Sequence, residues 1–259
     1  MKLVVKIGGA ALDNKELVSK FAKTIPSLCK EEHKLVIVHG GGAALSRTLK
    51  QLGCETSFVN GLRVTNAQTR DVAMMVLAGQ LNKQLVAAIG AAGQPAIGIC
   101  GGDLRIFRAA KKRHPDLGFV GEIISVDSQW IERLWSAGIV PVVSSLALGN
   151  DGEYYNVNAD SMASACAVAC GADALIYLTD VDGVKDADGL TMRWLEIGAI
   201  GQMIADATVS GGMLPKLEAC TKALKKGVAR VRILPANQSE VLPGFFTHPI
   251  ECGTEVIAS

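Results

Sequence analysis

The stretch Lys2-Leu-Val-Val-Lys-Ile-Gly-Gly9 joins a short apolar run to a pair of glycines, and its pattern is repeated along the chain. A nearly continuous apolar run that ends in glycine is typical of a strand covered by helices on both faces. Similar runs alternate with amphipathic stretches of about ten to fifteen residues. The alternation predicts an α/β sandwich around a mostly parallel sheet.

The expected elements follow from this alternation. Strands are expected at Lys2–Ile7, Leu35–His39, Ala96–Ile99, Ile139–Val143, Ala174–Leu178 and Arg230–Leu234. Helices are expected at Asp13–Leu28, Ala43–Gln51, Asn66–Leu77, Asp127–Ser136, Asn158–Cys170 and Met213–Lys226. The predicted N-caps are Asp13 and Asp127, and the predicted helix ends are Gly53, Gly138, Gly171 and Gly227.

Two connecting segments have signatures of their own. The pair Asn60-Gly61 lies between β-prone residues of the segment Phe58–Val64 and predicts a β-hairpin. The segment Gly101–Gly121 is expected to be an irregular excursion into solvent, and its basic run Lys111-Lys112-Arg113-His114 is interpreted as surface rather than as a ligand site. The chain has no linker-like composition, so a domain boundary is expected as a seam within the fold, near Leu175–Asp180.

Length, charge and cysteine usage limit the possible functions. The 259 residues are 49% hydrophobic and 20% charged, which argues against a disordered chain. The 26 basic and 25 acidic residues nearly balance, so no nucleic-acid partner is expected. No apolar run approaches the roughly 20 residues of a membrane span, and no secretory leader is recognised, so a cytoplasmic protein with no membrane partner is expected. The seven cysteines include no C-x-x-C, and Cys166 and Cys170 lack a third metal ligand, so neither disulfides nor a protein-bound metal is expected.

Three glycine-rich turns point to phosphate chemistry. They are Gly8-Gly9 after the first strand, Gly40-Gly41-Gly42 after the second, and Gly211-Gly212 before the last helix. Glycine lets the backbone approach a ligand closely, and a helix that starts nearby directs its free N–H groups at an anion. Each turn alone is more often structural, and none matches the P-loop or the dinucleotide-binding fingerprint.

Two lysines lie where the local pattern disfavours a cation. Lys6 interrupts a strand that is expected to be buried, so it needs either an anionic partner at the carboxyl end of the strand or an edge position from which it can reach water. Lys216 falls in the first turn of a helix, where the helix dipole disfavours positive charge unless a phosphate is bound. An exposed lysine near a helix start is the alternative interpretation.

Asp160 and Arg63 complete the candidate site. The segment Asn156-Val-Asn158-Ala-Asp160 is typical of a helix start, and capping alone would explain Asn158 and Asp160. A carboxylate there would also hold two lysines in place by reducing their repulsion. Arg63 lies on the predicted hairpin and is suited to bidentate capture of a carboxylate, although by itself it is an ordinary surface arginine.

Seven motifs together resemble the N-acetylglutamate kinase family, a branch of the amino acid kinase superfamily. They are Lys-Ile-Gly-Gly (6–9), His-Gly-Gly-Gly (39–42), Gly-Leu-Arg-Val-Thr (61–65), Gly-Phe-Val-Gly-Glu-Ile (118–123), Asn-Val-Asn-Ala-Asp (156–160), Thr-Asp-Val-Asp-Gly-Val (179–184) and Gly-Gly-Met-Leu-Pro-Lys (211–216). The resemblance implies a three-layer αβα sandwich whose central, mainly parallel open sheet has about eight strands. It also implies an N-terminal half, 1–175, for the amino-acid substrate and for dimerisation, and a C-terminal half, 176–259, for ATP.

The resemblance further implies phosphorylation of the γ-carboxylate of N-acetyl-L-glutamate by ATP, the second step of arginine biosynthesis, with Mg²⁺ held by the ATP phosphates. Lys6 and Lys216 would stabilise the transferring phosphoryl group, and Asp160 would orient both lysines. The implied N–H donors are Gly8, Gly9, Gly41 and Gly42, and the implied substrate ligands are Arg63, Asn156 and Asn158. The implied ATP-binding residues are Asp180, Val181, Asp182, Gly183, Val184, Lys185, Thr208, Val209 and Ser210.

Two other functions stay open at this point. A kinase for another N-acylated acidic amino acid, such as N-succinylglutamate or an N-blocked 2-aminoadipate, would use Arg63 and Asn156 equally well. A non-catalytic regulator that binds an amino acid or a nucleotide on the same fold is the other, although the joint presence of both lysines and Asp160 argues for catalysis. Only five residues precede Lys6, whereas arginine-inhibited members usually carry an additional N-terminal helix, so a homodimer that stays active in arginine is expected.

Overall fold

A computed structural model describes residues 1–248 and 251–258 and shows a central sheet of eight strands. The strands are β1 (Lys2–Ile7), β2 (Lys34–His39), β5 (Ala96–Ile99), β8 (Val140–Ser144), β11 (Ala174–Thr179), β12 (Trp194–Glu196), β13 (Arg230–Pro235) and β14 (Thr254–Ile257). Their order is β12-β14-β13-β11-β1-β2-β8-β5, and every neighbouring pair is parallel except β13 and β14. All six predicted strands are confirmed to within about a residue.

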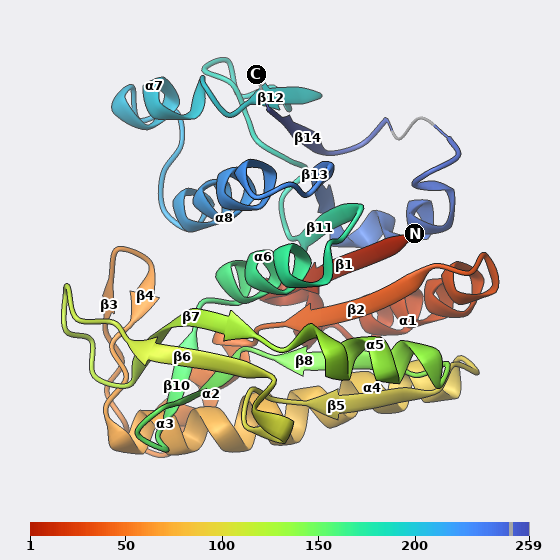
Figure 1. Ribbon diagram of the computed structural model, residues 1–259. Helices are drawn as coiled ribbons and strands as arrows, with labels where there is room; N and C mark the ends of the chain where they lie inside the picture. Colours follow the sequence, from red (N-terminus) through yellow and green to blue (C-terminus); the bar gives the residue numbers. More distant parts are fainter. Residues whose placement is uncertain (249–250, 259) are drawn as a thin grey trace.

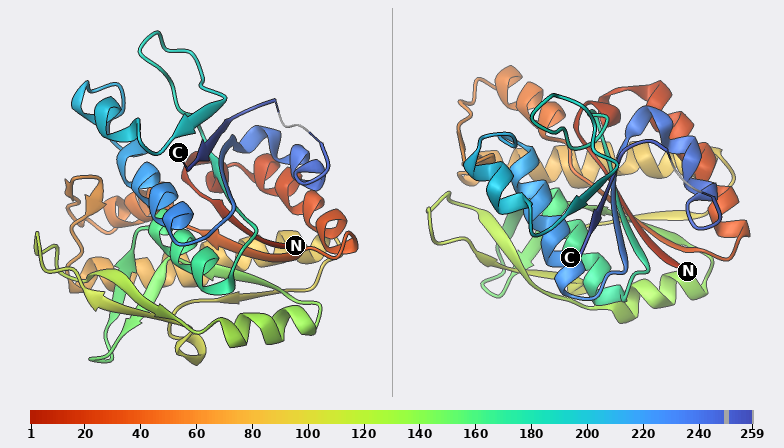
Figure 2. Two further views of the ribbon diagram at one scale, coloured as in Figure 1. Left: turned by 45° about the horizontal axis from the view of Figure 1, so that its top comes forward. Right: turned by 90° about the horizontal axis from the view of Figure 1, so that it is seen from above.

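Helices cover both faces of this sheet (Figures 1 and 2). One layer contains α1 (Lys15–Lys30), α4 (Asn82–Ala91) and the 3₁₀ helix η4 (Ala236–Gly244), and the other contains α5 (Ser128–Ser136), α6 (Ala159–Cys170) and α8 (Met213–Lys225). Alternate residues of β1 enter different cores, because Leu3 and Val5 pack with the first layer and Val4 with the second. Burial on both faces explains the continuous apolar runs and confirms the αβα sandwich.

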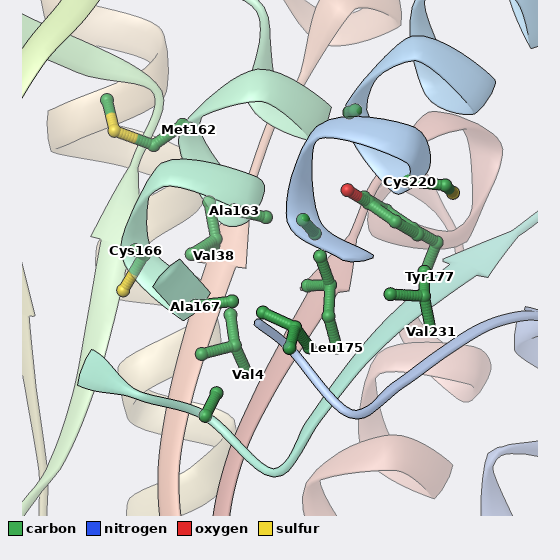
Figure 3. Packing of buried hydrophobic residues seen from close by; sticks show 14 of the residues in the cluster. Val4, Val38, Met162, Ala163, Cys166, Ala167, Leu175, Tyr177, Cys220 and Val231 are labelled. Carbon is green, nitrogen blue, oxygen red and sulfur yellow. The ribbon is translucent and has the colours of Figure 1, made fainter. Parts of the chain in front are cut away.

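The second core contains the packing that lies beneath the candidate site (Figure 3). Val4 of β1 and Leu175 of β11 lie under Ala163 and Ala167 of α6, and all four side chains are fully buried. Small side chains on α6 let the helix approach the sheet closely. Lys6 lies two residues after Val4 on the same strand, so its side chain points into this same helical layer.

The ends of the helices mostly follow the predicted signals. Asp127 caps α5 by accepting a hydrogen bond from the N–H of Gln129 at 3.1 Å. The four predicted terminal glycines all have positive φ, as a helix end requires (Gly53, Gly138, Gly171 and Gly227). The prediction for Asp13 is wrong, because Asn14 caps α1 and Asp13 instead pairs with Arg47. A short 3₁₀ helix, η1 (Gly9–Asp13), occupies the chain up to that point.

The helix predicted at Asn66–Leu77 is much longer in the structure. It runs as α3 (Ala67–Ala73), a π-helical segment η2 (Met74–Leu81) and α4, without interruption. By length and composition the run Ala67–Ala91 could span a membrane, but 44% of its most apolar 18-residue stretch is buried inside the protein. One side of the run packs into the hydrophobic cores through Val72, Val76, Leu77, Leu81, Leu85 and Ile89, whereas Met75 is exposed.

The expectation of an irregular excursion at Gly101–Gly121 is wrong. After η3 (Asp103–Arg105), β6 (Phe107–Lys111) and β7 (Val120–Val126) form a second, closed sheet with β9 (Leu146–Gly149) and β10 (Tyr154–Val157). Phe107 is fully buried, but a register shift after Arg108 breaks the alternation that would have revealed the strand. The basic run does lie at the surface, as predicted, where Lys112 pairs with Glu122.

The remaining elements are small. The predicted hairpin is confirmed as β3 (Phe58–Val59) and β4 (Leu62–Arg63), with positive φ at both Asn60 and Gly61. Helix α2 (Gly42–Gln51) follows β2 as expected, and the short α7 (Ile200–Ala205) was not predicted. The expected seam near Leu175–Asp180 falls on β11, which pairs with β1 on one side and β13 on the other, so one sheet runs through both predicted halves.

Candidate active site

A cleft of about 630 Å³ opens at the carboxyl ends of the central strands β1, β2 and β11. This is the edge of an open α/β sheet at which ligands bind. Twelve of the candidate catalytic and ligand-binding residues line it: Lys6, Gly8, Gly41, Gly42, Arg63, Asn156, Asn158, Asp160, Asp180, Val181, Ser210 and Lys216. Side chains that are far apart in the sequence therefore meet in one place.

Lys6, Asp160 and Lys216 form a buried ionic group at the base of the cleft, and we call it the lysine cluster. Nζ of Lys6 lies 2.8 Å from Oδ1 of Asp160, and Nζ of Lys216 lies 3.1 Å from Oδ2. The three residues are only 8%, 6% and 6% exposed, respectively. They come from β1 and from the first turns of α6 and α8. Three elements that pack through the second core thus fix the cluster.

The charges in this cluster do not cancel. Burial by itself would raise the pKa of Asp160, but the charges and hydrogen bonds of Lys6 and Lys216 outweigh it, and the pKa is lowered. Burial and the charge of Lys6 lower the pKa of Lys216, against the opposing effect of Asp160. With all three groups ionised, the cluster has a net charge of +1 at the base of a cleft, which suits it to an anionic ligand.

Steric constraints and backbone geometry explain why glycines occupy the turns at the cleft. A Cβ on Gly8 would lie 2.5 Å from Nζ of Lys6, so a side chain there would displace the ammonium group. Gly41 is the N-cap of α2, and the first backbone N–H groups of a helix have no partner within the helix. Gly9 begins η1. The turn after β2 therefore offers N–H donors to the same cleft that holds the lysine cluster.

Arg63 faces the cleft with one nitrogen unpaired. Its Nη2 donates to the carbonyl oxygen of Gly42 at 3.0 Å and to Oγ of Ser46 at 2.6 Å, while its guanidinium stacks on Phe58. Nη1 is buried and has no hydrogen-bond partner within the described residues. Burial lowers the pKa of Arg63 from its usual value. A guanidinium that lines the cleft is suited to a ligand carboxylate.

Both asparagines line the cleft. Asn156, on β10, donates from Nδ2 to Oγ1 of Thr65 at 3.3 Å. Asn158 caps α6 by accepting a hydrogen bond from the N–H of Ser161 at 3.0 Å. The cap gives Asn158 a structural role whether or not it also contacts a ligand.

The residues predicted to bind ATP divide into two groups. Asp180, Val181 and Ser210 line the cleft, whereas Asp182, Gly183, Val184, Lys185, Thr208 and Val209 do not. The N–H of Val184 donates to Oγ1 of Thr254 at 2.8 Å, and a Cβ on Gly183 would lie 2.6 Å from the same oxygen. These two residues attach the loop after β11 to β14.

Sequence reasoning missed several polar groups around the cluster. The ring of Tyr177 lies beneath Lys216, with Nζ 5.1 Å from its centre, and its hydroxyl donates to the carbonyl oxygen of Asp160 at 3.3 Å. Tyr177 is the register partner of Lys6 on the neighbouring strand, a relation that appears only once β1 and β11 are paired. Ser145 and Thr179 also line the cleft. Among residues 1–248 and 251–258, no three His, Cys, Asp or Glu side chains are grouped so as to hold a metal ion.

Comparisons with known proteins show which family the sequence and the fold match. The sequence profile of the amino acid kinase family matches residues 1–235. The chain is 62% identical to an acetylglutamate kinase of Koribacter versatilis (strain Ellin345) and 58% identical to one of Acidobacterium capsulatum, and each match covers all of both chains. The structure resembles a crystal structure of a Streptococcus mutans UA159 protein, with a TM-score of 0.86 and 27% identity over 100% of this chain and 99% of that one.

Proposed function

The chain belongs to the amino acid kinase family, and from this premise we propose that it transfers the γ-phosphoryl group of ATP to the γ-carboxylate of N-acetyl-L-glutamate. The products are N-acetyl-L-glutamyl 5-phosphate and ADP, so the enzyme is a kinase of amino-acid biosynthesis. The lysine cluster is the observation that carries the proposal, because two ammonium groups and one carboxylate leave a net positive charge at the base of the cleft.

The chemistry requires positioning and charge stabilisation. The attacking γ-carboxylate is already ionised near pH 7, so no general base has to remove a proton. Negative charge on the transferring phosphoryl group is stabilised by Lys6 and Lys216 and by the N–H groups of Gly8, Gly9, Gly41 and Gly42. Asp160 holds the two ammonium groups close together in spite of their repulsion. Mg²⁺ arrives with ATP, bound to its phosphates.

The two sides of the cleft divide the substrates between them. Arg63, with Asn156 and Asn158 on the same side, binds the α-carboxylate and neighbouring polar groups of N-acetylglutamate. The ATP side is formed by 180–185 and 208–210, of which Asp180, Val181 and Ser210 line the cleft. Residues 1–175 therefore serve mainly the amino-acid substrate, and residues 176–259 serve mainly the nucleotide.

Trapping of the acyl phosphate tests the proposal. The purified protein is incubated with Mg·ATP, hydroxylamine and N-acetyl-L-glutamate, and acylhydroxamate and ADP are measured. We expect both products to form in equal amounts, with a higher kcat/KM than for N-succinyl-L-glutamate or N-acetyl-L-2-aminoadipate. Release of ADP without hydroxamate, or a preference for either analogue, would contradict the assignment. The Lys6→Ala variant is the control for contaminating kinases.

Three finer expectations accompany the proposal. Chelation of Mg²⁺ with EDTA should abolish turnover, and added Mg²⁺ should restore it, because the ion is part of the nucleotide substrate. A homodimer is expected, and light scattering of the purified chain tests it. The cytoplasmic location stays a prediction.

A further inference from the structure

His39 has no role in the proposed reaction, although it opens the His-Gly-Gly-Gly motif. It is the last residue of β2, is fully buried, and does not line the cleft. Its Nδ1 lies 2.9 Å from the carbonyl oxygen of Gly40, and its Nε2 lies 3.0 Å from Nδ2 of Asn82. The imidazole thus contacts a turn at the cleft without reaching the cleft itself, as a positioning group would.

Hydrogen bonds link Val142, Asn82, His39 and Gly40 in series. The carbonyl oxygens at the two ends of this series can only accept, and they determine the direction of each hydrogen bond. Nδ2 of Asn82 also lies 2.9 Å from the carbonyl oxygen of Val142, which can only accept. The second N–H of the same amide group then donates to Nε2 of His39, so Nε2 carries no proton. Burial keeps the ring neutral, with its pKa lowered to about 4. The single ring proton is therefore on Nδ1, which donates to Gly40.

This bond determines how the peptide between Gly40 and Gly41 is oriented. In a trans peptide the carbonyl oxygen and the N–H point in opposite directions. With the oxygen of Gly40 held against the buried His39, the N–H of Gly41 points away from His39, toward the cleft that both glycines line. Because both residues are glycines, the backbone itself does little to prevent this peptide plane from rotating by about 180°.

The surroundings of Asn82 and Gly41 are shaped to this arrangement. A Cβ on Gly98 of β5 would lie 1.7 Å from Oδ1 of Asn82, so the glycine makes room for the amide. Gly41 has φ of 156°, and a Cβ there would lie 2.2 Å from Leu81. Leu81 ends the π-helical segment η2, and Asn82 is the next residue. The π-helical segment thus supplies both the wall against Gly41 and the amide group that holds His39.

The amide of Asn82 is poorly suited to packing alone. The residue is 1% exposed, and its Oδ1 has no hydrogen-bond partner within the described part of the chain. A buried polar atom without a partner destabilises the fold. Both N–H groups of the same amide are nevertheless used, which points to a role as a donor.

We propose that His39 and Asn82 are positioning residues that lock the Gly40–Gly41 peptide with its N–H facing the transferring phosphoryl group. The inference rests on the proposed function, because it assumes that a phosphoryl group occupies this end of the cleft. A donor held in place beforehand needs no reorganisation when charge develops in the transition state. Its loss should lower kcat more than it raises either KM.

Two substitutions at one position separate positioning from packing. In His39→Asn, the amide nitrogen takes the position of Nδ1 and can still donate to the carbonyl oxygen of Gly40. In His39→Gln, the amide nitrogen takes the position of Nε2 and cannot donate to Gly40. Both variants lose the ring, so their thermal stabilities should fall together. We expect kcat to fall about 10- to 100-fold in His39→Gln and about threefold or less in His39→Asn, with each KM within about threefold of wild type.

The tautomer of His39 in the unmodified protein gives a second test that needs no variant to be active. Two-bond ¹H–¹⁵N correlation spectra of histidine-labelled protein at pH 7 should show a neutral His39 ring with its proton on Nδ1. A proton on Nε2, or a kcat in His39→Gln within threefold of wild type, would overturn the proposal, as would equal losses in both variants. If wild type fails to phosphorylate N-acetylglutamate, the proposed function fails, whereas the tautomer still shows whether the peptide is locked.

Discussion

Two ionic groups in this protein have the same composition, two basic side chains around one carboxylate, but they differ in what surrounds them. One is the lysine cluster in the cleft. The other, the arginine cluster, consists of Arg230 and Arg232 of β13 and Glu255 of β14. Nε of Arg230 lies 2.9 Å from Oε1 of Glu255, and Nη1 of Arg232 lies 3.0 Å from Oε2. Each cluster has a net charge of +1 when its members are ionised.

The difference lies in where the remaining donors go. In the arginine cluster, Nη1 of Arg230 donates to the carbonyl oxygen of Phe245 at 3.2 Å, and Nη2 of Arg232 donates to that of Cys252 at 3.0 Å. Those bonds attach the C-terminal segment to the sheet. In the lysine cluster, the ammonium groups face the cleft. We therefore expect equal charge to serve the fold at the arginine cluster and a ligand at the lysine cluster, and composition alone does not distinguish the two.

The largest expected effect is on turnover, from removal of either lysine of the cleft. Lys6→Ala and Lys216→Ala should each lower kcat about 100- to 1,000-fold, because each removes charge stabilisation of the transition state. Lys6→Arg should stay impaired, since guanidinium differs in shape and reach. Lys20→Ala, which removes an exposed pair with Glu240, is the matched control. Near-normal turnover of Lys216→Ala at saturating substrate would remove that residue from the reaction.

Asp160 should control the pH at which activity falls on the alkaline side. The pKa of Lys216 is lowered from 10.5, so as pH rises this side chain loses its proton at a lower pH than an ordinary lysine does. Asp160 raises this pKa, so Asp160→Asn should move the alkaline fall of kcat to lower pH. We also expect kcat near neutral pH to fall about 10- to 100-fold, because the lysines lose their orientation. An unchanged pH profile of kcat would contradict this role.

Arg63 should act through substrate affinity. Its expected partner is the unreacting α-carboxylate, so its contact contributes about equally to the ground state and the transition state. Arg63→Ala should raise the KM for N-acetylglutamate about tenfold and lower kcat less. Ser46→Ala, which removes one hydrogen bond that positions the guanidinium, should produce a smaller rise. Steady-state kinetics with an unchanged KM in Arg63→Ala would exclude the residue from the substrate site.

The smallest expected effect on turnover comes from the arginine cluster. Glu255→Gln leaves the buried guanidinium of Arg232 and the partly exposed guanidinium of Arg230 without a carboxylate, so the free energy of unfolding should fall by about 1–3 kcal/mol. Turnover at saturating substrates should stay within about threefold of wild type, because the cluster lies outside the cleft. Chemical denaturation and initial rates measure the two quantities. A stable variant with greatly reduced kcat would reverse the assignment of the two clusters.

The sequence pattern predicts β1, β2, β8, β11 and β13 well because these strands are buried on both faces. It misses β12 and β14 of the same sheet, which are partly exposed. β6 includes exposed and half-buried residues, and the shift after Arg108 breaks its alternation. The helix predicted at Asn66–Leu77 ends too early, whereas the helical run in the structure continues to Ala91. The π-helical segment changes the spacing of the apolar residues, which hides the continuation.

The candidate site was predictable to the extent that its residues conflict with their local surroundings. A lysine inside a buried strand, as at Lys6, or at a helix start, as at Lys216, requires an explanation from the sequence alone. Tyr177 does not, because an aromatic residue in an apolar strand is ordinary. Its position beneath Lys216 depends on strand pairing and helix packing, which no local pattern contains.

The most direct test of the account is the binding of a phosphoryl-transfer mimic. Calorimetry measures the affinity for Mg·ADP with N-acetylglutamate, in the presence and absence of aluminium fluoride, which takes the place of the transferring phosphoryl group. We expect aluminium fluoride to tighten binding strongly in wild type and in Glu255→Gln, and to have little effect in Lys6→Ala and Lys216→Ala, although both lysine variants still bind Mg·ADP. Strong tightening in both lysine variants, or its loss in Glu255→Gln alone, would contradict the assignment of the lysine cluster to the reaction and the arginine cluster to the fold.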